Sequence, residues 1–464
     1  MLAVDLGGSS GRVMSGTVTD RRLETCIVHR FPNAAVQRSR ADGTSSLRWD
    51  FTHIVDEVTK GLRDGVANIN EVQSVGVDGW GLDYGIVGPD DEVLDEPFSY
   101  RDDRTIGAIE EFQLNERSEN TYARTGIAPM RENTIYQLLR DDRLAPEMRV
   151  LLLPDLLGLQ LSGVNRMELT NASTTGLLLA NSFDLDSMSL QHVGVRPEML
   201  APLVRSGTVL GPLTARTAAD TGLNSSVVEV AVGSHDTASA VASLPTTSRG
   251  VAYVSAGTWA LAGVVTDTPV LSVRALRARL TNERHVDGRN RLQRNHTGLW
   301  VLQECMREWA LTTALDFREL MAAATDLPEL DYTTDLDASE FAAPGRMIAK
   351  VRAAASSRGI DLTTPPEVAR FVVQSLAVTF ADTIASAAEI GNVQVNTIHV
   401  IGGGSQNQLL CRALAAASGL TVVAGPVEAS AIGNLLIQAY ALGAIDSFSD
   451  FGEIVRNSTE LAIY

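Results

Sequence analysis

Residues 1–18, MLAVDLGGSSGRVMSGTV, contain the pattern that decides the fold. An apolar segment ends near Asp5, a turn of glycine and serine follows, and a second apolar segment comes after Arg12. This order is typical of a β-hairpin. Residues 250–265, GVAYVSAGTWALAGVV, repeat it. Two such hairpins, each at the start of a half of the chain, predict a duplicated α/β arrangement of two domains rather than one large sheet.

The rest of the chain supplies further elements of two such domains. Residues 72–87, VQSVGVDGWGLDYGIV, predict another hairpin, which glycines interrupt. From residue 397 onward the pattern is strand, glycine-rich turn, helix, strand and helix, which predicts a parallel βαβ unit. The stretch SLPTTSRG, residues 243–250, is the most linker-like. We therefore expect one domain over residues 1–244 and a second domain over residues 245–464.

Composition and charge exclude several classes of protein. The 464 residues carry a net charge of −18, which argues against a general binder of nucleic acid or of an anionic membrane surface. The three cysteines are scattered and indicate neither a disulfide framework nor a CxxC metal site. The N-terminus does not resemble a signal peptide, and no apolar run approaches the ~18 residues that span a membrane. We expect a soluble, cytoplasmic protein with no nucleic-acid or membrane partner.

Both predicted hairpin turns are suited to phosphate. Their small residues leave backbone N–H groups open, and such groups can cradle phosphate oxygens. The chain lacks the motif G-x-x-x-x-G-K-[ST], and neither Lys60 nor Lys350 stands beside a glycine-rich turn, so ATP would need another architecture. Asp5 would face Mg²⁺ directly or through water, and Arg12 adds the nearby positive charge. The alternative is a plain hairpin with favourable turn residues.

Three further stretches combine polar groups in ways that either local structure or ligand binding explains. Residues 401–407, IGGGSQN, form a plain turn between strand and helix, or a flat glycine surface against a nucleotide. Residues 78–84, DGWGLDY, bring carboxylates and the indole of Trp80 to a turn, and this combination of side chains is typical of sugar-binding sites. Residues 291–300, RLQRNHTGLW, are a helix-capping region or a set of ligand contacts.

The stretch VAVGSHDTASAVASL, residues 230–244, places an imidazole beside a carboxylate where a predicted strand gives way to a predicted helix. In one interpretation Ser234 or Asp236 caps the first helical turn. In the other, Asp236 and its neighbour His235 take part in chemistry. The stretch by itself favours capping, and the functional interpretation depends on the other motifs.

Taken in order, these motifs resemble those of the FGGY family of carbohydrate kinases. The resemblance runs from residue 3 to about residue 437, nearly the whole chain. It is carried by AVDLGGSSGRV, VGVDGWGLDYGIV, SYRDDRT, GIAPMRENTIYQL, LLLPDLLGLQLSG, LTNASTTGLL, VGSHDTASAV, YVSAGTWALAG, GLWVLQE, HVIGGGSQNQLL and AGPVEASAIGNLLIQ.

The resemblance implies an α/β fold of two actin-like ATPase domains, of the ribonuclease H-like type, with an interdomain cleft. It implies ATP-dependent phosphorylation of the ketose L-rhamnulose at O1, with ATP and Mg²⁺ as cofactors. It matches residues to ATP at Gly8, Ser9, Ser10, Gly11, Arg12, Thr258, Gln303 and Gly403. It matches residues to the sugar at Gly81, His235, Asp236, Thr237 and Asn295.

The resemblance assigns Asp236 as the catalytic base. A sugar hydroxyl is a poor nucleophile when neutral, and a carboxylate within hydrogen-bond reach can orient it and accept its proton. Asp236 must then be ionised, and the helix N-terminus is expected to keep its pKa low. His296 and Thr297 stand where the family pattern has apolar residues, and Gly79 stands where it has threonine.

Other functions compete with this prediction. A kinase for another ketose, L-fuculose or D-xylulose, would use the same motifs. A non-catalytic actin-like module that binds sugar and ATP would need no base at Asp236. A hydrolytic ATPase without a sugar acceptor would leave the polar groups of residues 78–84 and 291–297 without a ligand.

Overall fold

The computed structural model describes residues 1–39, 43–69, 71–182, 184–246, 248, 250–313 and 315–464. They form two compact units, and the chain passes between them several times. Unit 1 comprises Met1–Thr247, Thr266–Leu292 and Ala429–Ser458, and unit 2 comprises Ser248–Val265, Gln293–Glu428 and Thr459–Tyr464. Both units are built from helices and sheet, as the predicted α/β class requires. The predicted linker, residues 243–250, includes residues 247 and 249, which lie outside the described residues.

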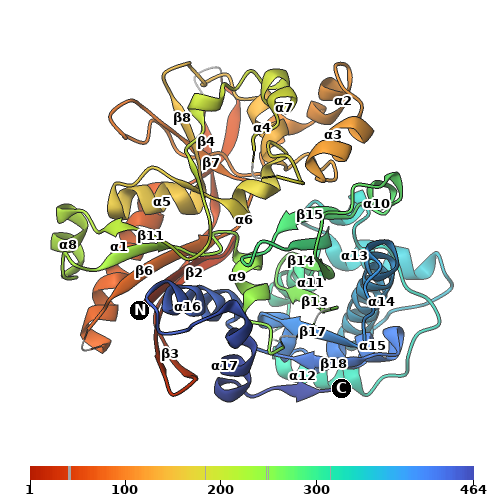
Figure 1. Ribbon diagram of the computed structural model, residues 1–464. Helices are drawn as coiled ribbons and strands as arrows, with labels where there is room; N and C mark the ends of the chain where they lie inside the picture. The colour runs from red at the N-terminus through yellow and green to blue at the C-terminus, as the bar shows by residue number, and fades with distance from the viewer. Residues whose placement is uncertain (40–42, 70, 183, 247, 249, 314) are drawn as a thin grey trace. The chain divides into compact units, whose positions relative to one another are not determined.

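Unit 1 is built on a six-stranded sheet with the strand order β11-β12-β6-β1-β2-β3. Figure 1 labels β11, β6, β2 and β3 of this sheet. These strands are β1 (Leu2–Leu6), β2 (Ser10–Thr19), β3 (Arg22–Pro32), β6 (Ser74–Gly79), β11 (Thr208–Pro212) and β12 (Val228–Ala231). β1 and β2 pair antiparallel with Asp5 opposite Arg12, which confirms the hairpin predicted at the N-terminus. β6 pairs parallel with both β1 and β12, and Asp5 lies opposite Asp78.

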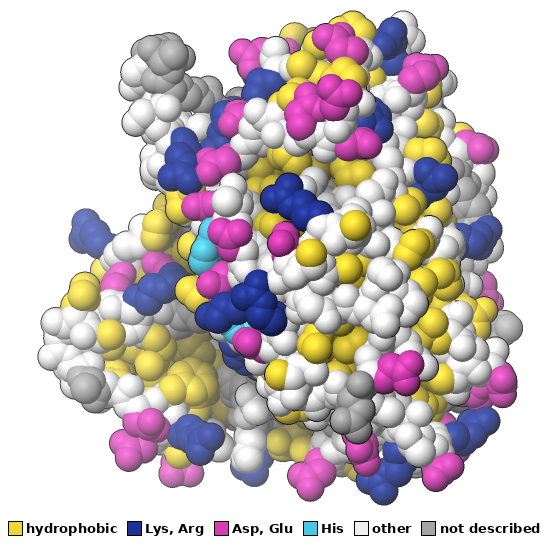
Figure 2. Space-filling model, turned by 90° about the vertical axis from the view of Figure 1, so that its left-hand side faces the viewer, with side chains coloured by type: hydrophobic (Ala, Val, Ile, Leu, Met, Phe, Trp, Pro, Cys, Tyr) yellow, Lys and Arg dark blue, Asp and Glu magenta, His cyan; other side chains and the backbone are white. Residues whose placement is uncertain are grey.

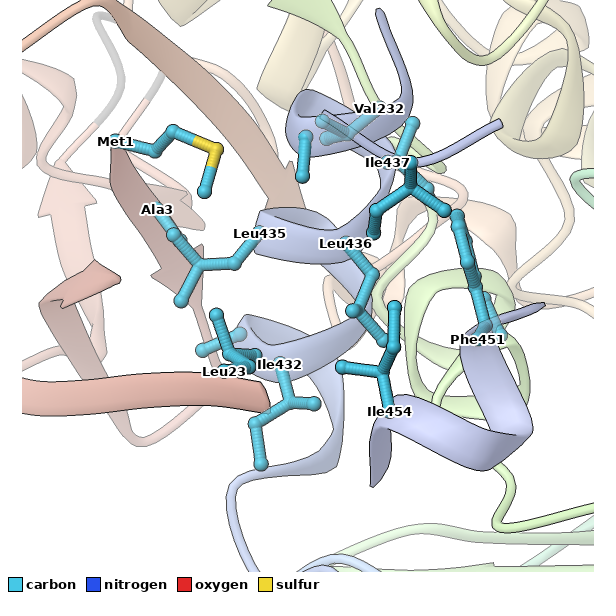
Figure 3. Packing of buried hydrophobic residues seen from close by; sticks show 14 of the residues in the cluster. Met1, Ala3, Leu23, Val232, Ile432, Leu435, Leu436, Ile437, Phe451 and Ile454 are labelled. Carbon is cyan, nitrogen blue, oxygen red and sulfur yellow. The ribbon is translucent and has the colours of Figure 1, made fainter. Parts of the chain in front are cut away.

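Helices cover both faces of this sheet. They are α1 (Phe51–Asn68), α5 (Leu153–Ser162), α8 (Ala215–Thr221), α9 (Asp236–Ala242), α16 (Ala429–Ala441) and α17 (Phe451–Ser458). Side chains alternate along β1, so Met1 and Ala3 pack with Leu435 of α16 (Figure 3), whereas Leu2 packs against Gly65 of α1. The buried cluster of Figure 3 therefore joins the N-terminal strands to a helix from near the end of the chain.

Smaller elements complete unit 1. They are β4 (Ala35–Ser39), β5 (Ser45–Trp49), β7 (Tyr84–Val87), β8 (Arg149–Leu152), β9 (Met167–Glu168), β10 (Leu203–Val204), β15 (Thr281–Arg284), α2 (Ala108–Gln113), α3 (Ser118–Thr125), α4 (Thr134–Leu139), α6 (Leu169–Ala172), α7 (Ser187–His192), α10 (Val273–Arg277) and the 3₁₀ helix η2 (Ser173–Thr175).

The hairpin predicted over residues 72–87 is wrong. β6 stays in the main sheet, whereas β7 pairs antiparallel with β8 in a separate two-stranded sheet. Leu82, between them, has a φ of 80°, and Asp83 accepts hydrogen bonds from the indoles of Trp49 and Trp80. These contacts direct the chain out of the main sheet before a return strand can pair.

Unit 2 repeats the plan. Its sheet contains the order β14-β13-β17-β18-β19, from β13 (Ala252–Ala256), β14 (Ala260–Thr266), β17 (Thr397–Ile401), β18 (Thr421–Ala424) and β19 (Ala462–Ile463). β13 and β14 form the second predicted hairpin, and β17 and β18 pair parallel, as the βαβ pattern predicts. β16 (Asn290–His296) begins in unit 1 and ends in unit 2. The helices are α11 (Trp300–Ala310), α12 (Phe317–Thr325), α13 (Met347–Ser356), α14 (Pro365–Gly391) and α15 (Gln408–Ser418).

One helix corrects the expectation of no membrane-length apolar run. Among the described residues, α14 alone is long and apolar enough to cross a membrane by length and composition. It packs against α12 and α15 in unit 2, and 61% of its apolar window is buried, as in the core helix of a soluble protein. On the face shown in Figure 2, acidic and basic side chains are interspersed.

Candidate functional site

Three acidic side chains of unit 1 lie where parallel strands end. Asp5 is near the end of β1, and Asp78 lies opposite it on β6. The Gly79 N–H donates to the Ser234 carbonyl at 3.0 Å, which brings the start of α9, with Asp236, beside the same strand ends. Asp5 and Asp78 are buried, whereas the Asp236 side chain is 29% exposed. In parallel α/β sheets this edge is the usual place for a ligand.

These three carboxylates interact electrostatically, and Asp5 also pairs with Arg12. The Arg12 guanidinium contacts Asp5 through Nε at 2.9 Å and Nη2 at 2.7 Å. Burial and the charges of Asp5 and Asp236 raise the pKa of Asp78 well above its usual range. Asn434 Nδ2 donates to Asp78 Oδ2 at 2.6 Å, while Asp78 Oδ1 has no hydrogen-bond partner in the described part of the chain.

This surplus of negative charge fits a divalent cation. Among the described residues there is no group of three or more His, Cys, Asp or Glu side chains that could hold a metal by itself. Mg²⁺ is usually held by one or two carboxylates together with water and phosphate oxygens, so it does not need such a group. Asp5 and the unpartnered oxygen of Asp78 suit that mode of binding.

The first predicted phosphate loop is open at its tip. Gly8, Ser9 and Ser10 are exposed. A Cβ at Gly8 would meet only the Tyr100 hydroxyl at 3.7 Å, whereas a Cβ at Gly11 would lie 2.2 Å from Cζ of Phe31. Gly8 therefore leaves room for a ligand, and Gly11 serves packing.

The sequence pattern did not indicate what supports this loop. Asn33 Nδ2 donates to the Gly7 carbonyl at 2.9 Å, and the Asn33 N–H donates to the Ser9 carbonyl at 3.2 Å. Asn33 follows β3, and no motif marks it.

Capping does not explain the side chains at the start of α9. His235 is the N-cap residue, and no side-chain hydrogen bond caps the helix. The Ser234 hydroxyl instead donates to Glu168 Oε2 at 3.2 Å, and Asp236 Oδ1 accepts from the Thr237 hydroxyl at 3.1 Å. Because no side-chain hydrogen bond caps α9, the capping interpretation is wrong. The Asp236 carboxylate can therefore contact a ligand.

The expectation of a low pKa for Asp236 is also wrong. Burial raises its pKa, and the neighbouring His235 and the hydrogen bond from Thr237 offset only part of this effect. Although the side chain is 29% exposed, the protein around it removes enough water to outweigh these favourable interactions. A raised pKa makes an ionised carboxylate a stronger proton acceptor.

A buried ion pair holds His235. Arg291, which is fully buried, places Nη2 at 3.1 Å from His235 Nδ1 and 3.0 Å from Glu283 Oε2. His235 Nε2 lies 3.6 Å from Asp236 Oδ1. Nδ1 is thus engaged by the ion pair, and Nε2 is the nitrogen that faces the carboxylate. Arg291 stands in a stretch that the sequence marked, whereas no motif marked Glu283.

The predicted sugar contact Gly81 lies beside His235. A Cβ at Gly81 would lie 3.5 Å from His235 Cδ2, and 3.2 and 3.3 Å from the polar atoms Asn171 Oδ1 and Thr174 Oγ1. Trp80 and Asp83 of the same stretch have structural partners. Asp83 accepts from the indoles of Trp49 and Trp80, and burial raises its pKa to about 6.

Unit 2 gathers the remaining predicted ATP residues at the ends of β13 and β17. These strands pair parallel, and the loop after β17 packs on the end of β13, with the Gly402 Cβ position 3.2 Å from the Ala256 carbonyl oxygen. Gly403, the next residue, would place a Cβ in open space. Thr258 follows β13, and its carbonyl accepts from the N–H of Trp300 at the start of α11, the helix that carries Gln303.

Asn295 lies near the end of β16, and its neighbours have structural roles. His296 Nδ1 lies 2.7 Å from Asp337 Oδ2, and the Thr297 N–H donates to Asp337 Oδ1 at 2.8 Å. His296 is buried and also contacts the Thr383 hydroxyl at 3.1 Å. The departure of His296 and Thr297 from the family pattern therefore serves the packing of unit 2.

The predicted site residues thus fall into two groups. Unit 1 brings together Asp5, Gly8, Ser9, Ser10, Gly11, Arg12, Gly81, His235, Asp236 and Thr237 at one edge of its sheet. Unit 2 contains Thr258, Asn295, Gln303 and Gly403.

Known proteins resemble this chain over its whole length. Residues 1–243 match the N-terminal domain, and residues 252–442 the C-terminal domain, of the FGGY family of carbohydrate kinases. Rhamnulokinase of Bacteroides thetaiotaomicron is 34% identical over 468 residues, covering 100% of this chain and 95% of the relative. Rhamnulokinase of Bacillus subtilis is also 34% identical, covering 100% of this chain and 94% of the relative.

Solved structures show the same fold. A ligand-bound xylulose kinase from Lactobacillus acidophilus matches with a TM-score of 0.81 at 15% identity, over 100% of this chain and 93% of that one. Glycerol kinase from Plasmodium falciparum, solved with ADP, matches with a TM-score of 0.79 at 13% identity, over 99% and 93%. These likenesses confirm the two-domain α/β fold that the resemblance implies.

Proposed function

Because the chain belongs to the FGGY family of carbohydrate kinases, we propose that it transfers the γ-phosphoryl group of ATP to O1 of L-rhamnulose. The products are L-rhamnulose 1-phosphate and ADP. The support for this sugar is the identity of 34% to rhamnulokinases that match the entire chain. The alternatives are a kinase for L-fuculose or D-xylulose and a non-catalytic module that binds sugar and ATP.

Asp236 is the general base in this mechanism. Its carboxylate accepts the O1 proton while the bond from O1 to the γ-phosphorus forms and the bond from that phosphorus to the bridging oxygen breaks, so that ADP leaves. The observation that supports this role is that the Asp236 carboxylate does not cap α9 and lies at the end of the parallel strands, where ligands usually bind. Thr237 steadies the carboxylate through Oδ1, and His235 faces it with Nε2.

The remaining roles follow the two groups of residues. The open loop at Gly8, Ser9, Ser10 and Gly11, with Arg12, binds ATP phosphates through its N–H groups, and Thr258, Gln303 and Gly403 complete the nucleotide site. Gly81, His235, Thr237 and Asn295 bind sugar hydroxyls.

Asp5 and Asp78 hold Mg²⁺ in this scheme, and their excess negative charge supports the assignment. When bound, Mg²⁺ neutralises charge on the transferred phosphoryl group. We place the protein in the cytoplasm. We assign the base and most of the sugar site to a first domain, residues 1–244, and most of the nucleotide site to a second, residues 245–464. The compact units differ from this division, because residues 266–292 and 429–458 belong to unit 1.

A coupled assay for ADP release tests the proposal. The full chain is incubated with ATP, Mg²⁺ and, in turn, L-rhamnulose, L-fuculose, D-xylulose, glycerol and L-rhamnose. L-rhamnulose should give the highest kcat/KM, because buried polar groups left unpaired by an inverted or missing hydroxyl disfavour the other sugars. A higher value for D-xylulose or glycerol would refute the proposed substrate, and no ADP release with any sugar would refute the kinase activity.

A further inference from the structure

Asn171 is a buried amide that nothing in the described chain satisfies. It lies on α6, is fully buried, and has no hydrogen-bond partner for either Oδ1 or Nδ2 among the described residues. The hydroxyls around it are all engaged. Thr170 Oγ1 donates to Glu168 Oε2, and Thr174 Oγ1 donates to the Asn171 carbonyl at 2.8 Å.

Such an amide needs an explanation. Burying an amide without hydrogen bonds destabilises the fold, so buried amides are normally paired with protein, water or ligand. Both amide atoms of Asn171 lack a partner, so the amide is unsatisfied whichever way it is turned. An apolar residue of the same size would suit the fold better at this position.

Gly81 places the Asn171 amide beside the predicted sugar contacts. An atom at the position of the absent Cβ would lie 3.2 Å from Asn171 Oδ1, 3.3 Å from Thr174 Oγ1 and 3.5 Å from His235 Cδ2. A side chain at residue 81 would therefore crowd these two polar atoms, and glycine is the residue that keeps the backbone close to them without doing so. The unpartnered amide therefore lies against Gly81, next to the imidazole that faces Asp236.

We propose that Asn171 binds a secondary hydroxyl of the sugar and helps to select which sugar is phosphorylated. The inference rests on the proposed function, since it needs a ketose at this site. An asparagine amide both accepts through Oδ1 and donates through Nδ2, so it matches a hydroxyl that does the same, or two adjacent hydroxyls. A sugar with that hydroxyl missing or inverted would leave the buried amide unpaired, which is how polar sites discriminate strongly.

The variant Asn171→Leu separates this role from a structural one. Leucine has the same number and branching of side-chain heavy atoms and needs no hydrogen-bond partner, so the melting temperature should stay the same or rise. The KM for L-rhamnulose should rise roughly tenfold or more, while the KM for ATP stays within about twofold. Wild-type protein should prefer L-rhamnulose over analogues in which a single hydroxyl is missing or inverted. For the analogue altered at the hydroxyl that Asn171 contacts, this preference should shrink by a similar factor in the variant.

Asn282 provides the matched control. It is also buried, but its Nδ2 donates to the carbonyls of Gly126 and Val270, and its Oδ1 accepts from the Val270 N–H at 2.7 Å. Asn282→Leu should therefore lower the melting temperature without changing the KM for the sugar selectively. Asn171→Ala, which removes the amide without adding bulk, should reproduce the rise in KM seen with Asn171→Leu.

The outcomes are distinguishable. If Asn171→Leu and Asn171→Ala keep the wild-type sugar KM and preference, Asn171 has no part in binding and the inference is wrong. If both lower the melting temperature and leave KM unchanged, its role is structural and the inference is equally wrong. Wild-type protein that phosphorylates no ketose would refute the proposed function itself, whereas an active wild type with unaffected variants refutes only the role of Asn171.

Discussion

Replacing Gly8 by valine tests whether the first loop grips the phosphates of ATP. Gly8 is exposed and does not adopt a positive φ, and its Cβ position has only the Tyr100 hydroxyl nearby, at 3.7 Å. The folded protein therefore accommodates a side chain there, and stability should change by no more than about 0.5 kcal/mol. A branched side chain would instead occupy the space that a phosphate needs to reach the backbone N–H groups.

The expected loss of ATP affinity follows from that steric conflict. Forcing a side chain into a filled site costs about 1–3 kcal/mol, and each 1.4 kcal/mol is a factor of ten in Kd, so ATP should bind roughly 5- to 150-fold more weakly. Gly11→Val is the contrasting variant, because its Cβ would lie 2.2 Å from the Phe31 ring. It should lower the stability of unit 1 by at least the same 1–3 kcal/mol.

Isothermal titration calorimetry with ATP and Mg²⁺ measures the first effect, and thermal unfolding measures the second. Sugar affinity of Gly8→Val, titrated separately, should stay near the wild-type value. In unit 2, Gly403→Val should behave like Gly8→Val, since a Cβ there meets nothing within 4 Å. A Gly8→Val protein with wild-type stability and wild-type ATP affinity would refute the assignment of this loop to phosphate.

Two further predictions concern acids. Asp236→Asn should retain ATP and sugar binding while kcat falls by roughly 10²-fold or more, and a near-wild-type kcat for the variant would remove Asp236 from the role of base. In the wild type, kcat/KM should fall as the pH is lowered, because Asp236 must be ionised to accept a proton. This fall should occur at a pH above the usual aspartate range, because burial raises the pKa of Asp236. Burial raises the pKa of Glu229 from 4.5 to about 7, so the folded wild type loses roughly 3 kcal/mol of stability as pH rises from about 4.5 through about 7. Glu229→Gln should escape that loss and exceed the wild type in urea unfolding at pH 8 but not at pH 4, and parallel pH dependences for the two proteins would contradict this.

Much of the fold could be predicted because its signals are local. The two hairpins are set by a turn of small residues between apolar segments, and the pairing partner lies only a few residues away. The βαβ pattern after residue 397 is equally short-ranged. The hairpin over residues 72–87 failed because β7 pairs with β8, a partner that no local pattern identifies.

The candidate site divides in the same way. Motifs marked Asp5, Gly8, His235 and Asp236, whose residue types and spacing are visible in the sequence. They did not mark Asn33, Glu283 or Asn171, whose significance lies in what each one touches or fails to touch. The interpretation of Ser234 or Asp236 as a cap failed for the same reason, since only the packed structure pairs the Ser234 hydroxyl with Glu168 and the Asp236 carboxylate with Thr237.

The sequence by itself therefore determined the family, the two hairpins that begin the two α/β domains, and the positions of the motif residues. Each of these depends on residues that are close together in the chain. Tertiary structure alone decided that Asp5 lies opposite Asp78, that Asn434 reaches Asp78 from near the other end of the chain, and that Gly81 faces Asn171. It also decided the pKa of Asp236, because burial depends on every element packed around the carboxylate. Local patterns specify strands and turns, whereas pairing, burial and unsatisfied polar groups arise only when distant segments pack together.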